Sequence, residues 1–429
     1  MRFGVNYTPS HDWFHAWLNP NWESISSDFK QISSLGLDHV RIFPIWPYMQ
    51  PNRTWINRKA LDDLRKMVHI AGDNGLDVYV DILQGHLSSF DFLPSWIVTW
   101  HSGNMFVDPE AVNAECNLIR AVNDELAEES AFKGLTLGNE VNQLSDDPHP
   151  TKMNATSAQI DTWLDTLLFS AKQNGRISLC SVNDGTWFIN NHPFTPMQLA
   201  NKGDMTVVHS WIFNGMAQGY GSTSEECASY GLYLSELAQA FAMNANRRVW
   251  LQEIGAPENV LDHDSVPDFC RKSIEYALDC RSMWGITWWC SHDVPKSMSD
   301  FPEFEHYLGL FDESGKIKPA GNIISEFAAE YKNYSCIDNV KNKNVAIVVP
   351  VDCDGNPTNR SSCGPGGSIC DLWMKSQMQG LRPTIITSKI SEDKDKLSAL
   401  GIDTLLKEDK TYSCRFYTAV SDSSIEENL

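Results

Sequence analysis

Two short apolar runs in this chain end abruptly on a glutamate. Glu140 follows residues 135–138 and one asparagine, and Glu253 follows residues 249–251 and one glutamine. Apolar runs of this kind are typical of strands buried on both faces of a sheet. Because a buried charge is unfavourable unless the site uses it, the two endings predict a pair of acids held at one end of a parallel sheet. A pair of carboxyl groups is also the machinery that hydrolyses glycosidic bonds.

Eight apolar runs in the first three quarters of the chain are strand candidates. Helical patterns with a spacing of 3.6 residues separate several of them, and Gly36 and Gly75 each stand where a helix C-cap is expected. Alternation of this kind predicts an α/β fold, a (β/α)8 TIM barrel over residues 1–335. The alternative, an open doubly wound sheet, would need a glycine-rich phosphate loop after an early strand, and the sequence has none there. The runs lie at residues 3–6, 39–43, 78–83, 135–138, 177–182, 205–209, 249–251 and 285–289.

Polar residues gather directly after the apolar runs. In a (β/α)8 barrel the active site lies at the C-terminal ends of the strands, while the opposite face serves stability. This asymmetry therefore predicts one site at that end of the barrel. Its candidates are Arg41 and Trp46, His86, Asn139 and Glu140, Asn183 and Asp184, His209 and Trp211, Glu253, and His292 and Asp293.

The chain is longer than a single domain usually is, and the alternation of apolar runs and helical patterns changes after residue 335. Residues 344–350 and 382–387 are strand-like, and residues 368–379 between them are helical in pattern. We expect a small β/α/β domain over residues 340–429. Its glycines form no dinucleotide fingerprint, so we expect a packing module or a homo-oligomer contact and no cofactor site.

Composition narrows the class of partner and the compartment. A formal net charge of −21 argues against nucleic acid, and 15 tryptophans supply flat amphipathic rings that can stack on sugars. The 11 cysteines mostly stand singly inside helix or strand patterns, which favours reduced thiols. We find no signal peptide and no segment of membrane-spanning length, so we expect a cytoplasmic protein with no membrane partner.

The two glutamates need different protonation states if they are to cleave a glycosidic bond with retention. One carboxyl must be protonated to donate to the leaving oxygen, and the other must be ionised to attack the anomeric carbon. Arg41 beside Glu253 would lower the pKa of that carboxyl and keep it anionic. The alternative is that either glutamate forms a buried ion pair, which two acids at matching strand ends make less favoured.

Several of these residues, in chain order, resemble glycoside hydrolase family 5 of the large (β/α)8 glycosidase clan over roughly residues 1–330. The resemblance implies that Glu140 is the acid/base and Glu253 the nucleophile. It also implies that Asn139 contacts the sugar 2-hydroxyl. The residues that carry the resemblance are Arg41, His86, Asn139, Glu140, His209, Glu253 and Trp289.

The same resemblance implies roles for the residues around the nucleophile. Arg41 and His209 would support Glu253, and Trp289 would form the platform under the reacting sugar. One position departs from the family: Trp211 stands where a tyrosine is usual. Because an indole lacks the phenolic hydroxyl that acts on the nucleophile, we expect Trp211 to stack instead.

Four longer motifs are similar to subfamily 18 of that family. The subfamily implies an intracellular β-mannosidase that acts on mannosyl-β-1,4-N-acetylglucosamine. The aromatic-rich segment of residues 88–109 could wall off the cleft and make it a pocket for the end of a short oligosaccharide. The motifs are Asn6-Tyr7-Thr8-Pro9-Ser10-His11, Arg41-Ile42-Phe43-Pro44-Ile45-Trp46-Pro47, Gln84-Gly85-His86 and Thr136-Leu137-Gly138-Asn139-Glu140-Val141-Asn142.

We therefore expect a retaining exo-β-glycosidase, specifically a β-mannosidase of short β-linked oligosaccharides, without metal or cofactor. An endo-β-mannanase or β-glucanase would share the same two acids, and a catalytically silent sugar-binding protein would keep the aromatic residues. The expected catalytic pair is Glu140 and Glu253. The expected substrate-binding residues are Arg41, Trp46, His86, Asn139, Asn183, His209, Trp211, Trp289 and Asp293.

Overall fold

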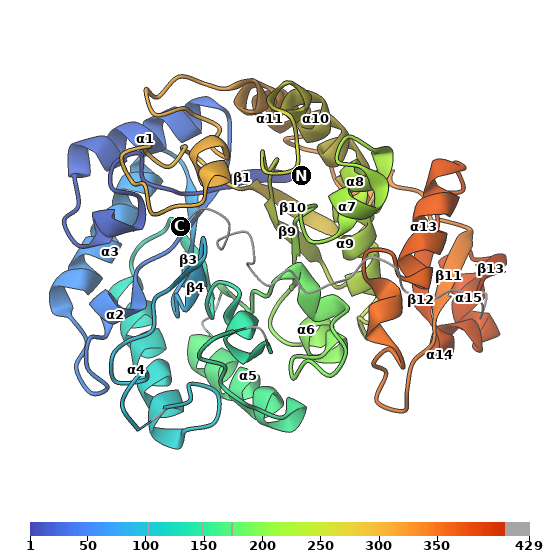
Figure 1. Cartoon of the computed structure of the whole chain (residues 1–429), viewed down its shortest axis with the longest axis horizontal. Helices are drawn as coiled ribbons and strands as arrows, with labels where there is room; N and C mark the ends of the chain where they lie inside the picture. The colour runs from blue at the N-terminus through green and yellow to red at the C-terminus, as the bar shows by residue number, and fades with distance from the viewer. Residues whose placement is uncertain (102, 148, 173–174, 408–429) are drawn as a thin grey trace.

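A computed structural model gives the fold and describes residues 1–101, 103–147, 149–172 and 175–407. Eight parallel strands form one curved sheet in the order β7-β6-β3-β2-β1-β10-β9-β8, and helices surround it (Figure 1). This arrangement confirms the predicted (β/α)8 barrel. Its strands are β1 (Arg2–Asn6), β2 (His39–Ile42), β3 (Asp77–Asp81), β6 (Phe132–Thr136), β7 (Ile177–Leu179), β8 (Thr206–Ser210), β9 (Val249–Ile254) and β10 (Met283–Trp288).

The helices of the barrel begin and end at residues that suit helix termini. Asn21 and Asn57 accept a backbone N–H of the first turn of α1 and α3, and Thr156 forms a capping box with Gln159 at the start of α5. Gly36 and Gly75 have positive φ angles beyond the ends of α1 and α3, as a C-cap requires. The helices are α1 (Trp22–Ser34), α2 (Trp46–Met49), α3 (Arg58–Asp73), α4 (Pro109–Glu125), α5 (Ser157–Ala171), α6 (Pro196–Asn201), α7 (Met216–Tyr220), α8 (Glu225–Ala228), α9 (Tyr230–Ala240), α10 (Val266–Ala277), α11 (Pro319–Glu330) and α12 (Cys336–Asn339).

The interior of the barrel changes from aromatic to polar along its axis. Near the N-terminal ends of the strands, the rings of Tyr79, Trp250 and Trp284 pack around His39. Since side chains on a strand alternate between faces, the next inward position on the same strands lies one layer higher. Those positions hold Arg41, Asp81 and Gln252, all fully buried. The aromatic layer closes the bottom of the barrel and the polar layer forms the floor of its C-terminal end.

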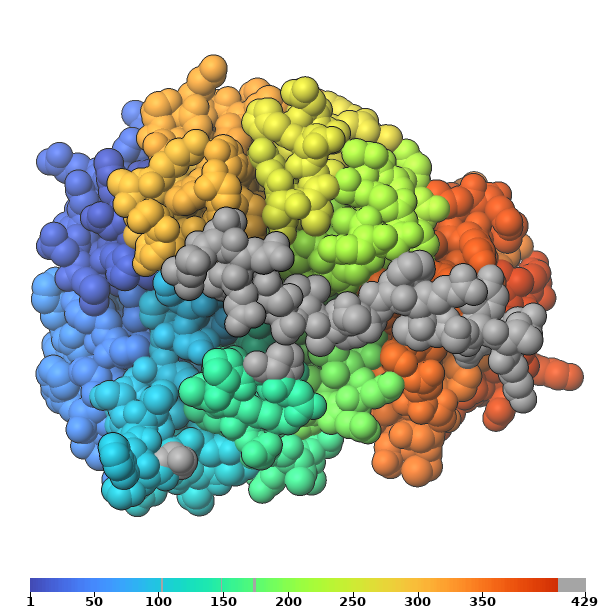
Figure 2. All heavy atoms as spheres, in the orientation of Figure 1, coloured from blue at the N-terminus to red at the C-terminus, as the bar shows by residue number. Residues whose placement is uncertain are grey.

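A second, three-stranded parallel sheet follows the barrel, in the order β12-β11-β13. It packs on α9, where Glu236 pairs with Lys343 at 3.1 Å and accepts a hydrogen bond from Thr384, and it forms a lobe beside the barrel (Figure 2). Two strands and the helix between them were predicted; β13 was not. The predicted domain runs to residue 429, and residues 408–429 lie outside the described chain. The elements are β11 (Val345–Val349), α13 (Ser368–Met378), β12 (Thr384–Thr387), α14 (Ser388–Ser391), α15 (Lys394–Leu400) and β13 (Thr404–Leu406).

A two-stranded antiparallel hairpin, β4 (His86–Leu87) and β5 (Phe90–Asp91), follows β3. Within the described residues, no helix combines the length and the apolar character needed to cross a membrane.

Candidate active site

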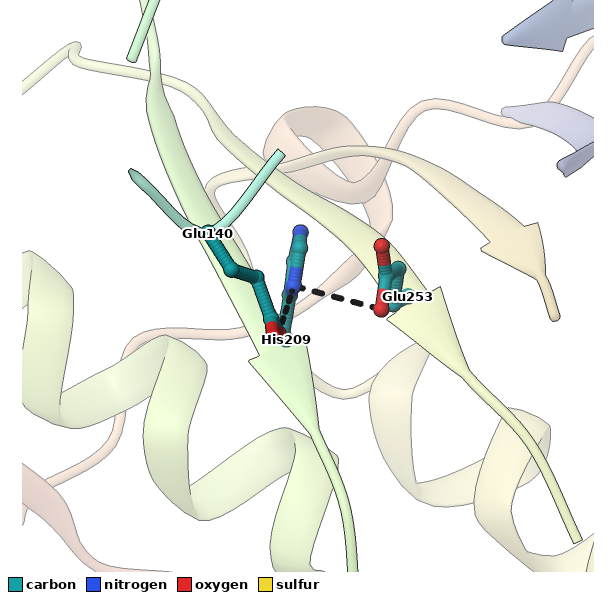
Figure 3. A group of neighbouring side chains, drawn as sticks. All are labelled: Glu140, His209 and Glu253. Carbon is teal, nitrogen blue, oxygen red and sulfur yellow. Dashed lines mark hydrogen bonds and ion pairs between the residues drawn. The ribbon is translucent and has the colours of Figure 1, made fainter. Parts of the chain in front are cut away.

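Glu140 and Glu253 come together at the C-terminal end of the barrel, with His209 between them (Figure 3). His209 Nδ1 lies 2.7 Å from Oε1 of Glu140 and 3.3 Å from Oε2 of Glu253. One carboxyl oxygen from each glutamate and one ring nitrogen of His209 all lie within 4.8 Å of one another. This spacing falls short of the roughly 6.5–9.5 Å that inverting glycosidases keep between their carboxyl groups. This closest approach is compatible with the roughly 5–5.5 Å between the carboxyl groups of retaining glycosidases.

Arg41 fixes Glu253 from below. Its Nη1 donates to Oε1 of Glu253 at 2.6 Å and to Oδ1 of Asn6 at 3.1 Å, while its Nε donates to Asp81 at 2.9 Å. Nη2 reaches the other oxygen of Asp81 and the side-chain oxygen of Asn139. Since Arg41 and Asp81 are fully buried, their charges compensate each other inside the barrel. The planar guanidinium of Arg41 therefore holds Glu253 and Asn139 in one rigid hydrogen-bond network.

The backbone that delivers Glu140 is unusual. Glu140 has φ 45° and ψ 37°, a left-handed conformation that is uncommon for a residue other than glycine. At Gly138 the end of β6 approaches the carbonyl oxygen of Leu83 so closely that a Cβ would overlap it. The chain bends at Asn139, and Gln143 donates to Oε2 of Glu140.

Trp211 contradicts our expectation that it only stacks. Its indole Nε1 donates to Oε2 of Glu253 at 3.2 Å. Toward a carboxylate a phenol acts as a donor, and an indole N–H supplies the same donor, so the reasoning from the missing hydroxyl was wrong. Trp211 also packs against Trp289, with ring centroids 6.5 Å apart, and Trp289 packs against Phe43 at 5.6 Å.

Burial and charge set the protonation of the three central groups. Burial disfavours the charged form of His209, but the carboxylates of Glu253 and Glu140 outweigh it and raise the pKa of the imidazole. Burial also opposes the charge on Glu140, yet the hydrogen bond and charge of His209 hold the pKa of Glu140 below its ordinary value. For Glu253, burial and the charge of Glu140 prevail over His209 and Arg41 and raise the pKa. Arg41 acts in the predicted direction, but the prediction of a lowered pKa for Glu253 was wrong because burial outweighs it. The raised pKa of His209 favours the protonated imidazole, which lies one hydrogen bond from Glu140.

Two other predicted residues lie beside this cluster. The carbonyl of His86 accepts from Asn139 at 3.0 Å, and its ring Nδ1 lies 3.1 Å from Asp91, which also pairs with His149 at 2.9 Å. Asn183 accepts from Asn142 at 3.0 Å in the segment after β7. The contacts fix the orientation of both side chains, and their binding roles stay predictions.

Trp46 and Asp293 are engaged elsewhere. Trp46 is fully buried, its indole donates to Gln50 at 3.1 Å, and its ring packs on Trp96. The carboxylate of Asp293 pairs with Lys318 at 2.8 Å and accepts from the backbone of Gly309. The structure joins neither side chain to the glutamates by a contact within the described residues, and a substrate role for either stays a prediction.

Sequence reasoning missed several polar residues of the site. Asp81 ends the apolar strand β3 on a carboxylate, the same signal that marked Glu140 and Glu253. Ser181 lies 3.0 Å from Nε2 of His209, and Gln252 lies 3.2 Å from it. Asp184 was noted only as one of the polar residues after a strand. Its burial, together with the charge of Glu140, raises its pKa to about 7.

The cluster of Glu140, His209 and Glu253 also has the donor types and spacing of a metal site. His209 Nδ1 faces both carboxylates at hydrogen-bonding distance, so an N–H at this nitrogen can donate to them. Buried paired carboxyls at the C-terminal end of a (β/α)8 barrel, one of them held by an arginine, define a retaining glycosidase.

Solved structures give the family. No protein-family model matches the chain, and no curated protein matches it either. GH5_18 from Bifidobacterium longum subsp. longum ATCC 55813 is 65% identical with a TM-score of 0.96, and the match covers 98% of this chain and 100% of that chain. The E140A variant of GH5_18 from the same organism, in complex with Manβ1-4GlcNAc, is 65% identical with a TM-score of 0.97, covering 99% and 100%. GH5_18 from Bifidobacterium longum subsp. infantis is 57% identical with a TM-score of 0.95, covering 98% and 99%.

The chain therefore belongs to glycoside hydrolase family 5, subfamily 18, which confirms the resemblance of its motifs. It is a retaining glycoside hydrolase of the β-mannosidase type.

Proposed function

We propose that this enzyme is an exo-β-mannosidase that releases mannose from the disaccharide Manβ1-4GlcNAc. The observation that carries the proposal is the relative of 65% identity whose E140A variant was crystallised with this disaccharide. Over the same length, this chain brings two glutamates within 4.8 Å of each other at the mouth of its barrel. A short β-linked oligosaccharide is thus the substrate class, and the disaccharide is its specific member.

In the first step, Glu140 acts as the acid and Glu253 as the nucleophile. Glu140 gives its proton to the glycosidic oxygen while a carboxylate oxygen of Glu253 attacks the anomeric carbon. The bond from that carbon to the leaving oxygen breaks, an ester bond to Glu253 forms, and N-acetylglucosamine departs as the alcohol. The proton that Glu140 donates reaches it from His209 across their 2.7 Å hydrogen bond, and it returns to His209 after the second step has protonated Glu140 again.

In the second step, water replaces the departed sugar. Glu140, now a carboxylate, takes a proton from the water as its oxygen attacks the anomeric carbon, and the ester bond to Glu253 breaks. Two inversions leave mannose in its original β configuration. Arg41 and Trp211 stabilise the charge that returns to Glu253 through their hydrogen bonds at 2.6 and 3.2 Å.

Substrate binding follows from the residues around the pair. Asn139 stands next to the acid, its oxygen accepts from Arg41 and its amide donates to the carbonyl of His86; this fixed orientation supports its proposed contact with the sugar 2-hydroxyl. Trp289 is the platform for the mannosyl ring. His209 supports both carboxyls from the barrel floor.

The test is a screen of the purified enzyme on aryl β-mannoside, β-glucoside and β-galactoside, with Manβ1-4GlcNAc and soluble β-mannan alongside. We expect the highest kcat/KM on the mannoside and the disaccharide. Faster cleavage of internal bonds in the polymer would favour an endo-β-mannanase, and a preference for the glucoside would favour a β-glucanase. Absence of any hydrolysis would contradict the proposal and favour a sugar-binding protein.

A cytoplasmic location and a homo-oligomer formed through the C-terminal domain remain part of the proposal. The ten cysteines of the described chain form no disulfide, which fits a reducing compartment. Light scattering of the full-length enzyme tests the oligomer, and a mass of one chain would contradict it.

A further inference from the structure

Glu305 carries a buried carboxyl that the protein satisfies only in part. It lies on a 3-10 helix (Glu303–Tyr307) in the long segment between β10 and α11, and only 4% of the residue is exposed. Within the described chain, no donor lies within hydrogen-bonding distance of its Oε2. Buried polar atoms in native proteins almost always have a partner, so a carboxyl left open in this way calls for a ligand or a water.

The surroundings of Glu305 belong to the active site. The side chains of Ser88 and Trp289 face its carboxyl, and the charge of Glu253 reaches it. The backbone holds this position firmly, because Val294 N–H donates to the carbonyl of Glu305 and His306 Nδ1 lies 2.8 Å from the carbonyl of Val294. Glu305 is therefore fixed next to the platform of the mannosyl ring, on a segment that leaves the last barrel strand.

Ser88 also carries a hydrogen-bonding group that the described residues leave unsatisfied. Its hydroxyl is buried and has no hydrogen-bond partner within the described residues. It stands in the β4–β5 hairpin, with a left-handed φ of 49°. Ser88 and Glu305 thus come from separate segments, one after β3 and one after β10, and neither is saturated by the hydrogen bonds of the described residues.

The protonation of Glu305 suits a sugar hydroxyl. Burial raises the pKa of Glu305 to about 7; Ser88 and Trp289 oppose the rise and the charge of Glu253 adds to it. The protonated carboxyl can donate and accept at once, as a hydroxyl group requires of its partner. Glu253 differs from Glu305, because each of its two carboxyl oxygens already accepts a hydrogen bond, one from Arg41 and one from Trp211.

We propose that Glu305, together with Ser88, binds a hydroxyl of the terminal mannosyl residue on the edge remote from the scissile bond, that is the 3-, 4- or 6-hydroxyl. The 2-hydroxyl belongs to Asn139, which adjoins the acid, whereas Glu305 and Ser88 lie beside Trp289 on separate segments. A β-1,4 chain is extended at the 4-hydroxyl, so a buried carboxyl at this edge helps to select the free end of the substrate. The inference rests on the proposed function.

The experiment measures the coupling between Glu305 and each hydroxyl. Aryl β-mannoside and its 3-, 4- and 6-deoxy analogues are hydrolysed by wild type, Glu305→Ala and Glu305→Gln, with the exposed glutamate of the same helix, Glu303→Ala, as the matched control. We expect wild type to lose about tenfold or more in kcat/KM on one deoxy analogue. Glu305→Ala should lose a similar factor on the parent mannoside and nothing further on that analogue. Glu305→Gln should fall between the two, and Glu303→Ala should match wild type.

A role of Glu305 in packing alone would lower the rates on all four substrates by the same factor. That result, from variants whose thermal unfolding is unchanged, would overturn the inference while an active wild type upholds the proposed function. A wild type inactive on β-mannosides would overturn the function instead. Calorimetric binding of Manβ1-4GlcNAc to wild type and Glu305→Ala would then decide about Glu305: weaker binding by the variant supports the inference, and equal binding contradicts it.

Discussion

At the scale of single residues, Trp211→Phe keeps the aromatic ring and removes the indole donor to Glu253. A hydrogen bond to a charged group contributes roughly 1.5–3 kcal/mol, so we expect kcat/KM to fall about 10- to 100-fold. The donor stabilises the carboxylate, and its loss raises the pKa of Glu253 further. Because activity needs the ionised form, the acidic limb of the pH–rate profile should move to higher pH. Trp211→Tyr restores a donor and should retain more activity; a Phe variant with the wild-type profile would contradict this role.

One sequence signal predicts the centre of the site. An apolar strand that ends on a carboxylate marks Glu140 and Glu253, and it marks Asp81 equally well. The apolar run of residues 78–83 continues past Asp81 and hides this ending. Glu305 has no such signal, since it lies in a 3-10 helix whose position depends on the path of a long loop. The hydrogen bond from Trp211 to Glu253 is visible only in the structure.

At the scale of elements, the hydrophobic pattern predicted the barrel strands well, and it predicted the short strands and loop helices outside the barrel poorly. All eight predicted runs overlap the barrel strands, because buried parallel strands are continuous apolar stretches. β13 has only three residues, Thr404–Leu406, and gives too short a pattern to recognise. The hairpin β4–β5 and the loop helices likewise depend on tertiary packing. The division into domains at residues 335–340 stays a prediction.

Gly138→Ala tests whether the end of β6 positions the acid. The added Cβ would overlap the backbone oxygen of Leu83, which cannot move as a side chain can. We expect the free energy of unfolding to fall by about 1–3 kcal/mol. Displacing Glu140 by about 1 Å should also reduce kcat/KM roughly 100-fold. Denaturant unfolding and steady-state kinetics measure the two effects, and wild-type kinetics in the variant would show that the close approach does not matter.

At the scale of the whole molecule, buried acids make stability depend on pH. Glu115 lies between α4 and α5, where its Oε2 accepts from Trp163 at 2.9 Å. Burial raises its pKa from 4.5 to about 8. The folded state therefore holds a proton that the unfolded state loses above about pH 4.5. This contribution to stability is complete below pH 4.5 and is lost as the pH rises through 8.

We expect the melting temperature of wild type to fall between pH 5 and pH 8. Glu115→Gln cannot titrate and should show a smaller fall over the same range. Differential scanning calorimetry at several pH values makes the comparison. If the melting temperature fell equally with pH in wild type and in Glu115→Gln, Glu115 would not be the group responsible.

The central claim is that Glu253 attacks the sugar while Glu140 serves as acid and base. Incubation with 2-deoxy-2-fluoro-β-mannosyl fluoride slows the second step and leaves the sugar on the nucleophile, so mass spectrometry of a peptic digest can locate it. The account predicts one fluoromannosyl group on the peptide that contains Glu253. A label on the peptide that contains Glu140, or turnover with no labelled peptide, would contradict it.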